Sequence, residues 1–122
     1  MVREEKRVLI CDDSKFMRLH IRNILEKVGY HEVYEAENGE DVLAKYEQVN
    51  PDMVFMDIVM PVKDGVSAVR DIMEYDRDAK VVMCSAMGQK PFILDAIQAG
   101  AKDFIIKPFE AEKIAKATTQ FL

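Results

Sequence analysis

Five short apolar segments, alternating with stretches of helical periodicity, constrain the fold of this chain more than any other feature. The segments are rich in residues that favour strands, and they begin 20 to 28 residues apart, which leaves room for a helix and two loops each time. They are residues 8–11, 33–36, 53–56, 81–84 and 104–106. Four of the five are apolar throughout, as expected of strands that are covered on both faces.

Each stretch between these segments has apolar residues at the spacing of one helical face. The first face consists of Met17, Ile21, Ile24, Leu25 and Val28, and Gly29 follows it as a stop signal. The apolar positions of the other four helices are Val42, Leu43 and Tyr46; Val69, Ile72 and Met73; Ile93, Ala96 and Ile97; and Ala111, Ile114, Ala115 and Thr118. Five successive βα units predict an α/β fold, a doubly wound five-stranded parallel sheet with helices on both faces.

Length and charge limit the classes of function. A chain of 122 residues without linker, repeat or low-complexity segment suits a single domain, residues 1–122. Its net charge of −5 disfavours direct binding to nucleic acid or to an anionic membrane. No apolar run approaches the length of a membrane span, and the charged start does not resemble a signal peptide. We expect a cytoplasmic protein in which Cys11 and Cys84 are buried thiols.

Polar side chains follow four of the five predicted strands. Asp12 and Asp13 follow the first, Asp57 the third, Ser85 the fourth and Lys107 the fifth. Each has an ordinary explanation by itself, such as a helix cap, a turn residue or a solvated charge. Because the carboxyl ends of parallel strands meet at one edge of a sheet, we expect the five side chains to converge there.

Such a group of side chains suits phosphoryl chemistry. Two carboxylates ~4 Å apart repel by ~4 kcal/mol at an effective dielectric of ~20, so three of them call for a cation. Oxygen ligands of this kind suit Mg²⁺. The Lys107 ammonium can pair with a phosphate, and the Ser85 hydroxyl can donate a hydrogen bond to it. Beside a divalent cation, Asp57 can act as a nucleophile and form an aspartyl phosphate. The residues therefore predict a metal-assisted phosphoryl acceptor.

The same residues resemble a known family. Asp12-Asp13, the run from Asp57 through Met60-Pro61 to Asp64-Gly65, Ser85-Ala86 and Lys107-Pro108-Phe109 resemble the receiver domain of two-component response regulators. The similarity spans the whole chain in the expected order. It implies a flavodoxin-like, CheY-like (βα)5 fold with strand order 2-1-3-4-5. Residues 84–88 and 99–109 look especially like chemotaxis-type members of the family.

The resemblance also implies roles for individual residues. Asp57 would accept the phosphoryl group from a kinase phosphohistidine. Asp13 would bind Mg²⁺ directly and Asp12 directly or through water, with Asp57 and the backbone carbonyl of Val59 completing the protein ligands.

A second set of implied roles concerns the phosphate. Ser85 would hydrogen-bond the phosphate and Lys107 would pair with it, next to a cis bond to Pro108. Phe104 matches an aromatic switch position that is more commonly Tyr. Val59 and Met87 are apolar where many relatives carry polar groups that could orient an attacking water. These departures predict a phosphorylated form that is slow to hydrolyse.

The implied function is a signalling switch rather than an enzyme, with at most slow autophosphorylation and autodephosphorylation. The expected partners are a CheA-like sensor histidine kinase, a downstream target such as the flagellar motor switch, and a phosphatase. They would bind through the fourth helix, fifth strand and fifth helix, within residues 89–122. No output domain is expected, and a monomer is the simplest state.

Three alternatives remain open. A phosphatase of the haloacid-dehalogenase type also forms an aspartyl phosphate, but its two aspartates are separated by one residue, whereas Asp12 and Asp13 are adjacent. In a flavodoxin-like carrier, the same two carboxylates would repel the flavin phosphate. Within the family, the chain could be a piece of a longer regulator or a phosphorelay intermediate.

Overall fold

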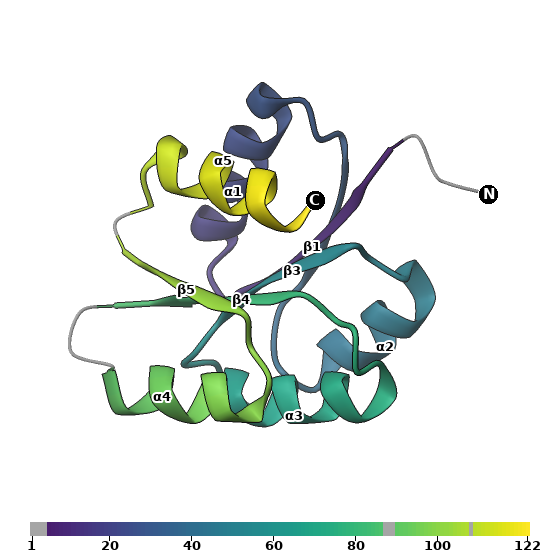
Figure 1. The fold of residues 1–122 in the computed structure, drawn as a ribbon, viewed down its shortest axis with the longest axis vertical. Helices are drawn as coiled ribbons and strands as arrows, with labels where there is room; N and C mark the ends of the chain where they lie inside the picture. Colours follow the sequence, from purple (N-terminus) through teal and green to yellow (C-terminus); the bar gives the residue numbers. More distant parts are fainter. Residues whose placement is uncertain (1–4, 87–89, 108) are drawn as a thin grey trace.

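The computed structural model describes residues 5–86, 90–107 and 109–122, which form five alternating strands and helices (Figure 1). The elements are β1 Arg7–Cys11, α1 Lys15–Val28, β2 Glu32–Ala36, α2 Asp41–Val49, β3 Met53–Asp57, α3 Gly65–Tyr75, β4 Val81–Ser85, α4 Lys90–Ala99, β5 Asp103–Ile106 and α5 Ala111–Phe121. Each predicted strand is present and extends by at most one residue at either end. The predicted βα alternation is therefore confirmed.

The strands form one sheet in the order β2-β1-β3-β4-β5, and every neighbouring pair is parallel. This is the order that the resemblance implies. The chain moves outward from β1 to β2 and then returns past β1 to β3, so the direction of winding reverses between β1 and β3. The carboxyl ends of these two central strands therefore border the crevice in which ligands of such sheets bind.

Helices cover both faces of the sheet: α1 and α5 lie on one face, and α2, α3 and α4 on the other (Figure 1). Each face has its own cluster of buried apolar side chains. The central strands β3 and β4 are buried at every position, which explains why they are apolar almost throughout. Cys11 and Cys84 are buried free thiols, as predicted. Burial, and to a smaller extent the nearby Asp12 carboxylate, raises the pKa of Cys11 to about 12.

Polar side chains cap the first turns of α1 and α3. The Ser14 hydroxyl accepts a hydrogen bond from the Met17 amide at the start of α1, and Asp64 accepts one from the Ser67 amide at the start of α3. Not every apolar residue at helical spacing is buried, because Val28 and Ile97 are 42% and 40% exposed. They lie at the margins of the apolar stripes, where the helix surface turns towards solvent.

Helix α4 is attached to the sheet by few buried side chains. Only Ile93 and Ala96 are buried in its described length, whereas Phe92, Leu94 and Ile97 are exposed. None of the helices in the described part of the chain has the length and apolar character that a membrane crossing requires.

Candidate functional site

Three carboxylates meet where β1 and β3 end. Asp12 and Asp13 follow β1 directly, and Asp57 is the last residue of β3. One oxygen from each lies within 4.8 Å of the other two. Asp12 and Asp57 are buried, while Asp13 is exposed at the edge of the group. The predicted convergence of the three aspartates is therefore confirmed.

Lys107, which follows the edge strand β5, reaches the same group from two strands away from β3. Its Nζ lies 3.5 Å from Asp57 Oδ1 and 3.8 Å from Asp12 Oδ2. It also lies 5.7 Å from the centre of the Phe109 ring, which restricts the side chain from another direction. One ammonium thus faces three carboxylates, so the group keeps an excess of negative charge.

Burial and mutual repulsion alter the acidity of these carboxyl groups. Burial first, and the Asp12 carboxylate second, raise the pKa of Asp57 to about 6, although Lys107 acts in the opposite direction. Burial also raises the pKa of Asp12. Both shifts mean that the folded protein holds these two negative charges at a cost, which a bound cation would offset.

Two buried oxygens at this edge lack hydrogen bonds. Within the described residues, Asp12 Oδ2 and Ser85 Oγ are the buried side-chain oxygens or nitrogens without a partner. Such atoms are uncommon because an unsatisfied buried polar group costs about 1–3 kcal/mol. A carboxylate oxygen suits a hard cation and a hydroxyl can donate to an anion, so the residues fit a divalent cation beside a phosphate.

The loop after β3 is held close to the acidic group. The Ile58 amide donates to the Cys84 carbonyl, and the Gly65 amide donates to the Ile58 carbonyl at 2.7 Å. A Cβ atom at Gly65 would lie 2.0 Å from the Asp57 carbonyl oxygen, so only glycine fits here. Val62, between Ile58 and Gly65 in the loop, has a φ of 71°, which is a strained backbone conformation for a β-branched residue. The loop is therefore constrained at both ends.

The remaining predicted residues are placed as follows. Ser85 ends β4 and is fully buried, and its neighbour Cys84 is the register partner of Asp57. The Val59 side chain is exposed, and its carbonyl as a metal ligand stays a prediction. Phe104 lies on the edge strand β5 with 41% of its surface exposed, so its role as a switch also stays a prediction. Met87 and the bond to Pro108 lie outside the described residues.

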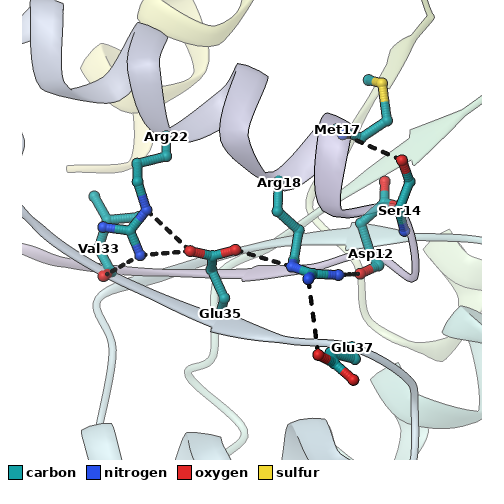
Figure 2. A network of polar contacts seen from close by, with 8 residues as sticks. All are labelled: Asp12, Ser14, Met17, Arg18, Arg22, Val33, Glu35 and Glu37. Carbon is teal, nitrogen blue, oxygen red and sulfur yellow. Dashed lines mark hydrogen bonds and ion pairs between the residues drawn. The ribbon is translucent and has the colours of Figure 1, made fainter.

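Sequence reasoning missed several polar residues that support the site. Arg18 of α1 is buried and donates to the Asp12 carbonyl, and Glu35 of β2 links Arg18 to Arg22 (Figure 2). His20 Nε2 lies 3.0 Å from the Phe109 carbonyl, which ties α1 to the segment after Lys107. One signal was available for Arg18: it lies three and seven residues before Ile21 and Leu25, on the buried face of its helix.

The fold and the site together define a class of protein: a doubly wound α/β protein with an acidic, lysine-paired group at its strand ends. Comparison with known families gives the same class, since the response regulator receiver domain model matches residues 8–119. The chain belongs to the response regulator receiver domain family. It is accordingly a signalling protein built around a phosphoacceptor switch.

Similar proteins agree with this assignment. The chain is 51% identical to the chemotaxis protein CheY of Bacillus subtilis over 95% of this chain and 97% of the relative. It is 48% identical to CheY of Thermotoga maritima over 92% of this chain and 93% of the relative. Among solved structures, the CheX-CheY-BeF3-Mg²⁺ complex of Borrelia burgdorferi is similar, with a TM-score of 0.88, 36% identity and coverage of 94% of this chain and 87% of the other.

Proposed function

We propose that residues 1–122 form a single receiver domain that acts as a chemotaxis signalling switch, and that Asp57 is its phosphoacceptor. One observation carries the proposal: the buried Asp57 carboxylate lies 3.5 Å from Lys107 Nζ and in one group with Asp12, beside a strand that ends in the unpartnered hydroxyl of Ser85. This arrangement offers a nucleophile, a compensating charge and a hydrogen-bond donor at one place. The homology to chemotaxis CheY proteins supports the pathway.

In the transfer step, a carboxylate oxygen of Asp57 attacks the phosphorus of a phosphohistidine. The new O–P bond forms as the P–N bond breaks, and the imidazole leaves with the electron pair of that bond. Asp12 and Asp13 would hold Mg²⁺, with Asp57 and the Val59 carbonyl. When bound, Mg²⁺ neutralises charge on the transferring phosphoryl group. Mg²⁺ is proposed because the ligands are oxygens and a similar structure contains it.

The phosphorylated aspartate adds negative charge and acceptor oxygens next to Ser85 and Lys107. Ser85 Oγ then gains the partner that it lacks, and Lys107 exchanges its carboxylate contacts for phosphate contacts. We propose that these changes reach Phe104 and the surface of α4, β5 and α5, which binds the downstream target. Helix α4 suits this role because it is anchored by only Ile93 and Ala96 within its described length.

The proposed partners follow from the homology. A CheA-like histidine kinase donates the phosphoryl group, a protein of the flagellar motor switch type receives the signal, and a phosphatase ends it. The solved complex of a similar CheY with CheX supports binding to other proteins. The protein would meet these partners as a monomer in the cytoplasm, and it would bind neither nucleic acid nor membrane.

Incubation with acetyl phosphate and Mg²⁺ tests the phosphoacceptor. Intact mass spectrometry is expected to show one added phosphoryl group on the parent protein and none on Asp57→Asn or after addition of EDTA. Equal labelling of Asp57→Asn would show that another residue accepts the group. Repeated turnover of a phosphomonoester, in place of stoichiometric labelling, would instead favour the phosphatase alternative.

Lys107→Ala is expected to separate phosphorylation from the response. The variant should still accept a phosphoryl group, because Asp57 and the metal ligands remain. The response should be weaker, because the ammonium that pairs with the phosphate is gone. Affinity for the target is measured with and without acetyl phosphate. The increase in affinity on phosphorylation should be at least about tenfold smaller in the variant than in the parent protein, which corresponds to a loss of about 1.4 kcal/mol. An undiminished rise would remove Lys107 from the switch.

A further inference from the structure

Arg18 is a charged residue on the buried side of α1. Its side chain is only 9% exposed, and it extends towards the ends of β1 and β2 (Figure 2). Nη1 donates to the backbone carbonyl of Asp12 at 2.7 Å, and Nε donates to Glu35 Oε1 at 2.9 Å. Burying a guanidinium is costly unless its donors form hydrogen bonds, and these two contacts offset that cost.

The contact with the carbonyl completes the restraint of Asp12. The Asp12 amide donates to the Ala36 carbonyl, and Oδ1 accepts a hydrogen bond from the Ser14 amide. With the carbonyl held by Arg18, Oδ2 is the one polar atom of Asp12 without a hydrogen bond in the described structure. It is also the atom that lies 3.8 Å from Lys107 Nζ, inside the acidic group. The restraints thus leave the carboxylate with one oxygen for a ligand.

Glu35 and Arg22 in turn hold Arg18 in place. Arg22 donates to Glu35 Oε2 through Nε and Nη2, and its Nη2 also donates to the Val33 carbonyl (Figure 2). Burial acts to raise the pKa of Glu35, but the hydrogen bonds from Arg22 and Arg18 hold it below its usual value. Glu35 is therefore ionised and shared between two guanidinium groups. Glu37 lies 3.8 Å from Arg18 and Glu26 lies 3.9 Å from Arg22, so the network carries no excess positive charge.

We propose that Arg18 is a positioning residue for the metal site: by holding the Asp12 carbonyl, it directs Asp12 Oδ2 towards the cation. This inference rests on the proposed function, in which Asp12 holds Mg²⁺. Arg18 does not touch the cation itself. Groups that orient metal ligands commonly affect metal affinity by about 10–100-fold, so the effect of removing Arg18 is measurable. Glu35 and Arg22 act through Arg18 and are less important for binding.

Calorimetric titration with MgCl₂ alone, at pH 8, tests the proposal without phosphorylation. Arg18→Met removes the carbonyl contact and the charge while it keeps much of the volume, and it is expected to weaken Mg²⁺ binding about tenfold. The matched control is Arg22→Met, which removes the neighbouring guanidinium from the same network but leaves the Asp12 carbonyl contact. It is expected to bind Mg²⁺ within about twofold of the parent protein, since it lacks contact with the metal ligands.

Folding is measured in parallel by urea denaturation. If Arg18→Met does not fold, Arg18→Lys replaces it, because lysine keeps the charge but cannot donate to Asp12 and Glu35 through a planar fork; a loss of about threefold is expected. Parent-like Mg²⁺ affinity in a folded Arg18 variant would overturn the proposal, as would an equal loss in Arg22→Met. Phosphorylation of the parent protein at Asp57 distinguishes failure of the proposed function from failure of the Arg18 proposal. If Asp57 is not labelled, the proposed function fails; if Asp57 is labelled, only the role of Arg18 is in question.

Discussion

Gly65→Ala is expected to lower the free energy of unfolding by about 3 kcal/mol, because the added methyl group collides with backbone rather than with a flexible side chain. The new Cβ atom would lie 2.0 Å from the Asp57 carbonyl oxygen and 3.0 Å from Ile58 Cα. Relief requires that α3 and the end of β3 separate, which also breaks the hydrogen bond from the Gly65 amide to the Ile58 carbonyl. Urea denaturation of parent and variant measures the loss.

Gly29→Ala is the matched control for this prediction. Gly29 ends α1 with a φ of 114°, but a Cβ atom there meets nothing within 4 Å. Its substitution therefore introduces backbone strain without a collision and should cost about 1 kcal/mol. Equal losses in the two variants would mean that the loop after β3 moves aside easily and does not constrain Asp57.

Asp57→Asn is expected to stabilise the protein in Mg²⁺-free buffer at pH 8, by about 2–3 kcal/mol. The pKa of Asp57 rises from 3.8 to about 6 on folding, chiefly through burial and then through Asp12. The folded state therefore binds this proton more tightly than the unfolded state does. Stability from this group is present below pH 4 and is lost as the pH rises to 6, so the ionised parent carries the full penalty at pH 8.

The gain from Asp57→Asn should consequently shrink as the pH falls from 6 to 4. Under the proposed function, Mg²⁺ should stabilise the parent more than the variant, because it would bind the folded acidic group and the variant would lack one ligand charge. Urea denaturation at several pH values, with and without Mg²⁺, measures both effects. Asp78→Asn, an exposed aspartate in the turn before β4, is the control and should change little. A destabilised Asp57→Asn in Mg²⁺-free buffer at pH 8 would contradict the assigned electrostatics.

The strands and the site could be predicted from the sequence because their signals are local. Residues of β3 and β4 are apolar because both faces are covered, and each strand ends in a polar residue at the point where it leaves the core. Parallel topology then brings Asp12, Asp13 and Asp57 together, whatever the exact helix packing. The sequence could not predict that Ser85 and Asp12 each keep an oxygen without a hydrogen bond, because this depends on the position of every neighbouring donor.

The network behind the site could not be predicted in the same way. Arg18, Arg22 and Glu35 have the charges of an ordinary solvated helix and edge strand, and their pairing depends on how α1 lies across β2. The His20 ring likewise reaches the Phe109 carbonyl, 89 residues further along the chain. Long-range contacts between side chains carry no periodic signal, which is why such groups escape sequence reasoning.

Helix α4 has a consequence for how this protein can diverge. Its attachment through Ile93 and Ala96 leaves Phe92, Leu94 and Ile97 outside the core, so substitutions at these three positions should have small effects on folding. The acidic group lies on other elements and would keep its chemistry. Duplicated copies of such a gene could therefore acquire new binding partners through a few changes on one helix, while the phosphorylation reaction is inherited unchanged.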